Sequence, residues 1–214
     1  MLFENVNKIL MIQKITIEGY KSIKEQTVEL FPINILIGGN GIGKSNFISA
    51  FTLIHNLYER NLQNYVLTKG GSDSLLYMGK KETDHLSFDL FFAERGKDAH
   101  NRFIVNMKEA QDSLFIERID TAYHNGVSWH KQLHEVNKQE SSFKNDHTGQ
   151  AFYVNSFLRE FEVYHFHDTG DRSPMKGKCN MDDNVSLKNN GANIAAFLYL
   201  SLIHISEPTR RVVI

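Results

Sequence analysis

The chain has 214 residues, of which 41% are hydrophobic and 23% are charged, and this composition is typical of an ordinary globular protein. Its formal net charge of −1 supplies no bulk attraction for nucleic acid, so any contact with DNA would require a local basic patch. The single cysteine, Cys179, excludes an internal disulfide and a thiolate metal cluster, and we expect a cytoplasmic protein. The sequence contains no run of about 18 apolar residues, so it predicts no membrane span.

The first clear elements along the chain are short strands. Residues 13–18 alternate between apolar and polar side chains, as in a half-buried strand. A turn over residues 19–22 and a return strand over 27–30 follow. Residues 34–37, Asn-Ile-Leu-Ile, predict a buried strand that ends at a run of glycines.

Residues 38–45, Gly-Gly-Asn-Gly-Ile-Gly-Lys-Ser, match the phosphate-loop pattern of a glycine, four residues and Gly-Lys-Ser. Glycines accept a positive φ, so successive backbone N–H groups can converge on one anion. Lys44 would place its charge on the β- and γ-phosphates as the catalytic residue, and Ser45 would give Mg²⁺ a hydroxyl ligand. The helix expected over residues 46–58 adds its N-terminal amides.

The pattern therefore predicts ATP and Mg²⁺ as ligands. The expected nucleotide-binding residues are Gly38, Gly39, Asn40, Gly41, Ile42, Gly43, Lys44, Ser45 and Asn46.

The middle of the chain, residues 64–150, is more polar and predicts a β-rich insertion or lobe. Strands are expected over residues 86–92, 102–107 and 114–119. After it, residues 162–166 predict another core strand, and residues 193–200 begin a helix.

The two ends of the chain differ from the rest. Met11 is the expected start, and residues 1–10 would be an upstream extension. Residues 201–214 resemble a translated read-through tail, with Pro208 stopping the helix. We therefore expect residues 1–200 to be the N-terminal part of a longer domain.

The loop and several blocks around it resemble the RecF/SMC-like, ABC-class ATPases. The loop has the form Asn-Gly-x-Gly-Lys-Ser-Asn that is typical of that family, and residues 15–23 resemble its first strand and turn. Residues 70–79, 163–169 and 190–198 resemble blocks of a bacterial subgroup of predicted AAA-family ATPases. The resemblance covers about residues 12–200 and implies an α/β P-loop NTPase fold of ABC/RecF-like type.

In such heads ATP is hydrolysed when two heads dimerise, so the resemblance implies a homodimer of heads. It also implies work in DNA repair or antiphage defence, with DNA or a nuclease as partner. It places residues 163–169 before the Q-loop, where Asp168, together with His167, would lie near Mg²⁺ or the attacking water. No glutamine stands there, and a turn-capping role for Asp168 is an open alternative.

Other family features are missing from the sequence. The signature segment, the apolar strand ending in Asp-Glu and the switch histidine normally follow the region that residues 12–200 resemble. Without those carboxylates the chain holds no general base for water, so we expect ATP binding without turnover. A non-hydrolysing nucleotide-binding interaction module is the alternative.

Several other residues match weaker patterns. Residues 137–140, Asn-Lys-Gln-Glu, superficially match a guanine-reading motif, but glutamate replaces its aspartate. His130 and His134 would share a helix face as in a zinc site, although exposed histidines are the more ordinary explanation. His165 and His167 would share one face of a strand as a core or interface pair, with a place near the nucleotide as the alternative. Tyr20 and Lys21 are candidates to flank the adenine, and Arg172, Lys176 and Lys178 form a modest basic cluster.

Overall fold

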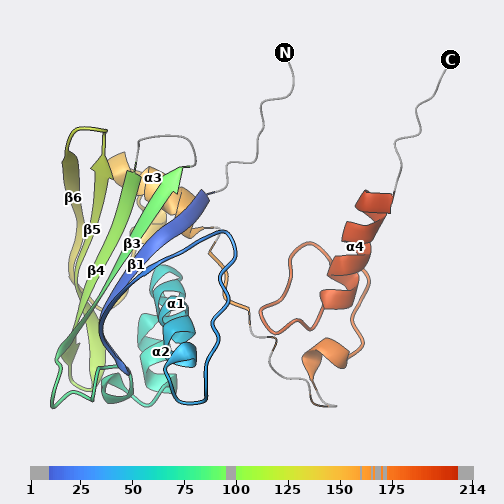
Figure 1. The fold of residues 1–214 in the computed structure, drawn as a ribbon, viewed down its shortest axis with the longest axis horizontal. Helices are drawn as coiled ribbons and strands as arrows, with labels where there is room; N and C mark the ends of the chain where they lie inside the picture. Colours follow the sequence, from blue (N-terminus) through green and yellow to red (C-terminus); the bar gives the residue numbers. More distant parts are fainter. Residues whose placement is uncertain are drawn as a thin grey trace. The chain divides into compact units, whose positions relative to one another are not determined.

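The computed structural model describes residues 10–94, 100–159, 161–164, 166, 170 and 173–206. The chain divides into two compact units, one up to residue 161 and the other from residue 162 on. The first unit contains the glycine loop and is built around a β-sheet (Figure 1).

The sheet of the first unit has six strands in the order β2-β1-β3-β4-β5-β6, and every neighbouring pair is antiparallel. The strand-rich middle of the chain therefore continues the sheet that the first two strands begin, and it lies in the same compact unit as they do. The strands are β1 (Leu10–Tyr20), β2 (Ile23–Glu29), β3 (His85–Glu94), β4 (His100–Ala110), β5 (Ser113–His124) and β6 (Trp129–Lys138).

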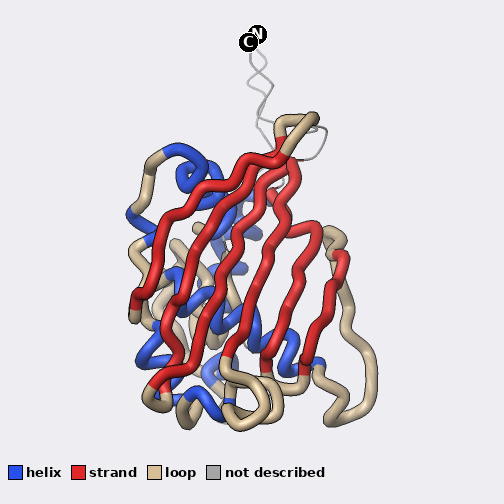
Figure 2. Tube along the Cα trace, turned by 90° about the vertical axis from the view of Figure 1, so that its left-hand side faces the viewer, coloured by secondary structure: helices blue, strands red, loops and turns tan. Residues whose placement is uncertain are grey.

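Three helices pack on one face of this sheet, and Figure 2 shows the strands in front of helical segments. They are α1 (Lys44–Tyr58), α2 (Leu62–Thr68) and α3 (Gly149–Leu158), with short 3₁₀ turns at Ser72–Ser74 and Phe143–Asn145. The helices pack on this face because the strands alternate: in β4, Phe103, Val105 and Met107 are buried, while the residues between them are only half-buried.

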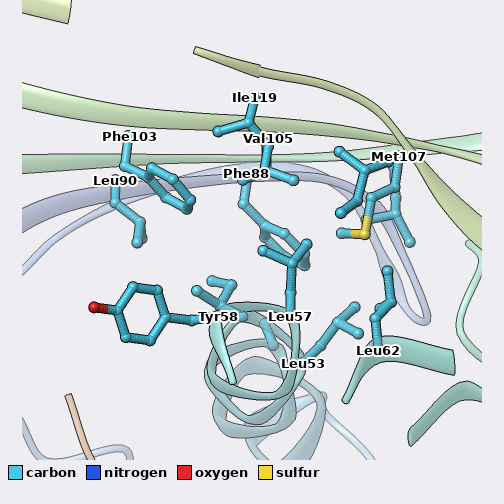
Figure 3. Packing of buried hydrophobic residues seen from close by; sticks show 14 of the residues in the cluster. Leu53, Leu57, Tyr58, Leu62, Phe88, Leu90, Phe103, Val105, Met107 and Ile119 are labelled. Carbon is cyan, nitrogen blue, oxygen red and sulfur yellow. The ribbon is translucent and has the colours of Figure 1, made fainter. Parts of the chain in front are cut away.

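The core lies between these helices and the sheet (Figure 3). Leu53 and Leu57 of α1 point at Phe88 and its neighbours on β3 and β4. Full burial of such a side chain stabilises the fold by about 1.5–3 kcal/mol. The predicted strands at 13–18, 86–92, 102–107 and 114–119 are confirmed, and the return strand at 27–30 is found within β2 up to Glu29. β6 was not foreseen, because its sequence is polar and its apolar residues do not alternate regularly.

The predicted strand at residues 34–37 is wrong. This stretch is not in a strand, and Ile33, Ile35 and Ile37 are 82, 78 and 87% exposed. Residues 34–37 pair with no strand among the described residues, and an extended backbone needs a paired neighbour to become part of a sheet. The helix that follows is confirmed as α1, and it buries Leu53, Ile54 and Leu57.

The second unit contains a 3₁₀ turn at Pro174–Lys176 and helix α4 (Ile194–Ser206), which confirms the helix expected from residue 193. Asn193 is buried and shapes the preceding loop: its Oδ1 accepts from Lys188 N, and its Nδ2 donates to Asp183 O and Ser186 O. The core strand predicted at 162–166 is wrong for its described residues, which have no regular structure. Tyr164 and Phe166 instead stack on each other at the surface.

Candidate functional site: the glycine loop

The glycine loop between residue 38 and α1 has the backbone that its sequence predicts. Gly38, Gly41 and Gly43 have φ values of 156°, 82° and 98°, and side chains rarely adopt such values. A Cβ placed on Gly39 or Gly41 would meet nothing within 4 Å, so open space lies beside both residues. The loop therefore faces solvent and leaves room for a ligand beside these two glycines.

The Lys44 side chain folds back over this loop. Its Nζ donates to the carbonyl oxygens of Gly38 at 2.7 Å and Gly39 at 2.5 Å. The ammonium thus lies at the start of the loop and is held there by backbone oxygens. An anion that enters the open space would meet this positive charge directly.

The first turn of α1 supplies further donors. The first helical hydrogen bond runs from Phe47 N to Gly43 O, at 2.9 Å. The amides of Lys44, Ser45 and Asn46 therefore precede the helical ladder, and the positive end of the helix dipole lies here. Ser45 is exposed at this end of the helix.

The turn between β1 and β2 braces the start of α1. Asn46 Nδ2 donates to Ser22 Oγ at 2.8 Å, and a Cβ on Gly43 would come within 3.3 Å of the same oxygen. One helical turn later, Ser49 Oγ bonds to the Tyr20 hydroxyl at 2.9 Å and accepts from Lys21 Nζ at 3.1 Å. Sequence reasoning singled out the turn but missed Ser49, since nothing in a helical serine signals a partner 28 residues away.

Burial alters the acid–base properties of this turn. It raises the pKa of the Tyr20 phenol, which therefore stays protonated. It also lowers the pKa of the Lys21 ammonium, and the charge of Lys69 lowers that pKa further. Tyr20 is fully buried and its ring packs against Phe88. The expectation that Tyr20 and Lys21 flank the adenine stays a prediction.

A groove of about 480 Å³ adjoins the loop. It is bounded by β2, by residues 35–37 and by the start of α1, including Lys44 and Phe47. The exposed isoleucines before the loop thus form one wall of a space next to the proposed phosphate site.

The model of the AAA ATPase domain matches residues 11–195 of the chain. The chain belongs to the AAA ATPase domain family. No curated protein matched it. The mixed α/β architecture fits a P-loop NTPase-like fold, and membership of the family indicates ATP binding and hydrolysis as the class of activity.

The block at residues 70–79 of this AAA ATPase domain lies against the β1–β2 turn. Lys21 N donates to Leu75 O, Tyr77 N to Gly19 O and Ser72 N to Asp112 O. Residues 70–79 thus link the β1–β2 turn to the connection between β4 and β5. Through Tyr20, Lys21 and Ser22 of that turn, they help to position the glycine loop.

Two weaker candidates have structural roles in the AAA ATPase domain. Glu140 accepts from Leu62 N and Gln63 N and so caps α2. Its carboxylate is therefore not free to bind a guanine, as the guanine-reading motif at residues 137–140 would require. His130 and His134 lie on strand β6, so the helical zinc pattern is wrong. Their region contains no cluster of three or more potential metal ligands among the residues that the structure describes.

His134 belongs to a buried network. Its Nδ1 bonds to Asp146 Oδ2 at 2.7 Å and its Nε2 to Thr121 Oγ1 at 2.8 Å. Its side chain is 1% exposed, so no substrate reaches it.

Asp168, His165, His167 and Arg172 lie outside the described residues, and their expected roles stay predictions. Lys176 and Lys178 belong to the second unit, at and just after its 3₁₀ turn. No helix in the described part of the chain has the length and apolar character needed to cross a bilayer.

Proposed function

We propose that this chain binds ATP with Mg²⁺ through residues 38–46. One observation carries the proposal: the Lys44 ammonium lies at the start of a loop whose glycines have positive φ values. The amides of the first turn of α1, which make no helical hydrogen bond, lie next to it. The backbone amides and Lys44 would hold the phosphates, and the exposed Ser45 hydroxyl would be a Mg²⁺ ligand. Bound Mg²⁺ would neutralise charge that develops on the phosphates.

Lys44 has a specific role in this proposal. Its ammonium donates to Gly38 O and Gly39 O, and phosphate oxygens are stronger acceptors because they are charged. The ammonium would therefore contact the phosphates with little movement. Asn46, held by Ser22, keeps the first helical turn in place against the β1–β2 turn.

We further propose that the whole protein is a RecF/SMC-like, ABC-class ATPase head that hydrolyses ATP as a homodimer in DNA repair or antiphage defence. The loop form Asn-Gly-x-Gly-Lys-Ser-Asn supports this proposal. A DNA or nuclease partner and Asp168 as a Mg²⁺-shell residue belong to the same proposal. The alternative is a nucleotide-binding interaction module that does not hydrolyse ATP.

Calorimetric titration with MgATP tests the first proposal. Lys44→Ala should weaken binding at least tenfold, because it removes the charge at the loop. Lys81→Ala, which removes an exposed lysine elsewhere, should bind like the natural chain. Equal affinities of the Lys44→Ala variant and the natural chain would refute the proposed site.

Phosphate release separates the two functions. It should be measured on the longest natural chain that contains this sequence, with sedimentation in MgATP to detect dimers. Turnover that Lys44→Ala abolishes supports the ATPase, whereas tight binding without turnover supports the interaction module.

A further inference from the structure

The face of the sheet opposite the helices has a cluster of rings at one end. We call Phe91, His100, His124 and Trp129, from four neighbouring strands, the aromatic platform. Its ring centroids lie 5.1 Å apart for Phe91 and His100, 6.1 Å for Phe91 and Trp129, and 5.1 Å for His124 and Trp129. These strands are neighbours in the six-stranded sheet. Figure 2 shows the strands of the sheet side by side.

Cations surround these rings. The Arg102 guanidinium lies 5.3 Å from the centroid of the Trp129 ring, and Lys14 Nζ lies 5.2 Å from that of Phe91. Asp89 pairs with Arg102 and fixes the guanidinium against the indole. The charge of Arg102 is therefore largely balanced, and its plane extends the platform.

The register of the sheet places two further cations at the ends of one row. Lys14, Phe91, Arg102, Ala122 and Lys131 are successive cross-strand partners from β1 to β6. Lys14 and Lys131 form no ion pair with any described residue, although Glu29 lies opposite Lys14 on β2. At about 4.8 Å between strands, the row spans about 19 Å.

Packing of the fold does not require this arrangement. Cross-strand ring pairs stabilise a sheet, yet Trp129 is 42% exposed on an edge strand and the helices pack on the other face. Half-exposed rings can hold bases by stacking, and lysines that pair with no described carboxylate can hold phosphates by charge.

We propose that the aromatic platform, with Lys14 and Lys131, binds single-stranded nucleic acid without sequence preference. Bases stack on Trp129 and Phe91, and the two lysines contact backbone phosphates. The site lies on the sheet face and does not depend on the function proposed for the glycine loop. The net charge of −1 limits binding to this local patch, so affinity is modest.

Trp129 is the only tryptophan of the chain, so its fluorescence reports on the platform directly. Titration of the full chain with oligothymidylate should quench this emission, with a dissociation constant between about 1 and 100 µM at low salt. Two phosphate contacts predict a slope of about −1.4 for the logarithm of the binding constant against that of the salt concentration.

Variants separate charge from stacking. Lys14→Gln combined with Lys131→Gln should weaken binding about tenfold and bring the salt slope near zero. Phe91→Leu should weaken binding about tenfold and leave the slope unchanged. Lys138→Gln, at the other end of β6, should change neither.

Absence of quenching up to 1 mM oligothymidylate would overturn the proposal. So would unchanged binding in the double lysine variant, because the nucleic acid would then lie elsewhere. Equal quenching by polyglutamate would also overturn it, because that result indicates a surface for any polyanion.

Discussion

Gly19 shows how one backbone position supports the start of the glycine loop. Its φ is +70°, and a Cβ there would collide with the His85 carbonyl oxygen and press on the Leu86 Cα. The residue lies at the end of β1, directly before the Tyr20–Ser22 turn that braces α1. Only glycine allows β1 and β3 to approach this closely while the chain turns toward the helix.

Gly19→Ala should therefore be costly. An alanine would have to adopt a left-handed backbone, and its Cβ would clash with the backbone of His85 and Leu86. Together these two costs should lower the free energy of unfolding by about 2–5 kcal/mol, measured by urea denaturation. Gly126→Ala is the matched control: its φ is +91°, but its Cβ would meet nothing within 4 Å, so a loss of about 1 kcal/mol is expected. Equal losses in the two variants would contradict the assigned contact with His85.

Asp146 links stability to pH. Burial opposes its ionisation, but hydrogen bonds from Thr148 and His134 outweigh burial and lower the pKa of the carboxyl. A pKa below the unfolded value of about 3.9 means that this stabilisation is present above about pH 4 and is lost as the pH falls through the folded pKa.

The difference in unfolding free energy between the natural chain and Asp146→Asn should accordingly shrink below about pH 4. Urea midpoints measured from pH 6 to pH 3 check this prediction. Glu117→Gln, at an exposed position of β5, provides the baseline. A difference that stays constant over the whole range would show that the ionised carboxylate is not the stabilising species.

At the scale of an element, α2 depends on a side chain from far along the chain. The helix has 7 residues, too few to be stable alone, and its N-cap Asn61 makes no side-chain cap hydrogen bond. Glu140 replaces that cap, with Oε1 and Oε2 accepting from Gln63 N at 2.8 Å and Leu62 N at 3.0 Å. The segment that follows β6 thereby fixes the start of a helix that contributes Leu62 and Val66 to the core.

Glu140→Ala should reduce the unfolding free energy by about 1–2 kcal/mol, through loss of the cap and of the charge at the helix dipole. Glu140→Gln keeps one acceptor and should lose about half as much. Chemical denaturation of the two variants, with Glu117→Ala as the exposed control, measures these losses. Full stability of Glu140→Ala would contradict the capping role.

At the scale of the whole molecule, the large cluster of buried hydrophobic residues belongs to the first unit in the part of the chain that the structure describes. Every residue of the core cluster lies between Ile12 and Leu158, and the sheet and three helices that form it end before residue 162. A domain that contains its own core can fold by itself.

A chain ended after Phe161 should therefore unfold cooperatively, with a urea midpoint close to that of the first transition of the longer chain. Near-ultraviolet circular dichroism and urea titration test this prediction. A non-cooperative transition, or loss of the aromatic signal, would show that the second unit is needed for folding.

Local chemistry explains how much of the fold was predictable. The glycine loop, α1, the first strand and the three strands of the middle region follow from periods of 3.6 and 2 residues and from glycine's backbone freedom. β6 escaped prediction because a polar edge strand carries no clean alternation. Residues 34–37 gave the opposite error, a strand that was predicted but not found. Their apolar run predicts a buried strand, but burial requires neighbouring strands.

The sequence by itself determined the positive-φ glycine loop and the helix after it, because this local structure needs only its own glycines and the residues that follow. Tertiary structure decided what surrounds that loop: the bracing by Ser22 and Ser49, the continuity of residues 64–150 with β1, the cap from Glu140 and the aromatic platform on the opposite face. Each of these depends on residues brought together from distant parts of the chain, and a local pattern contains no record of such pairing.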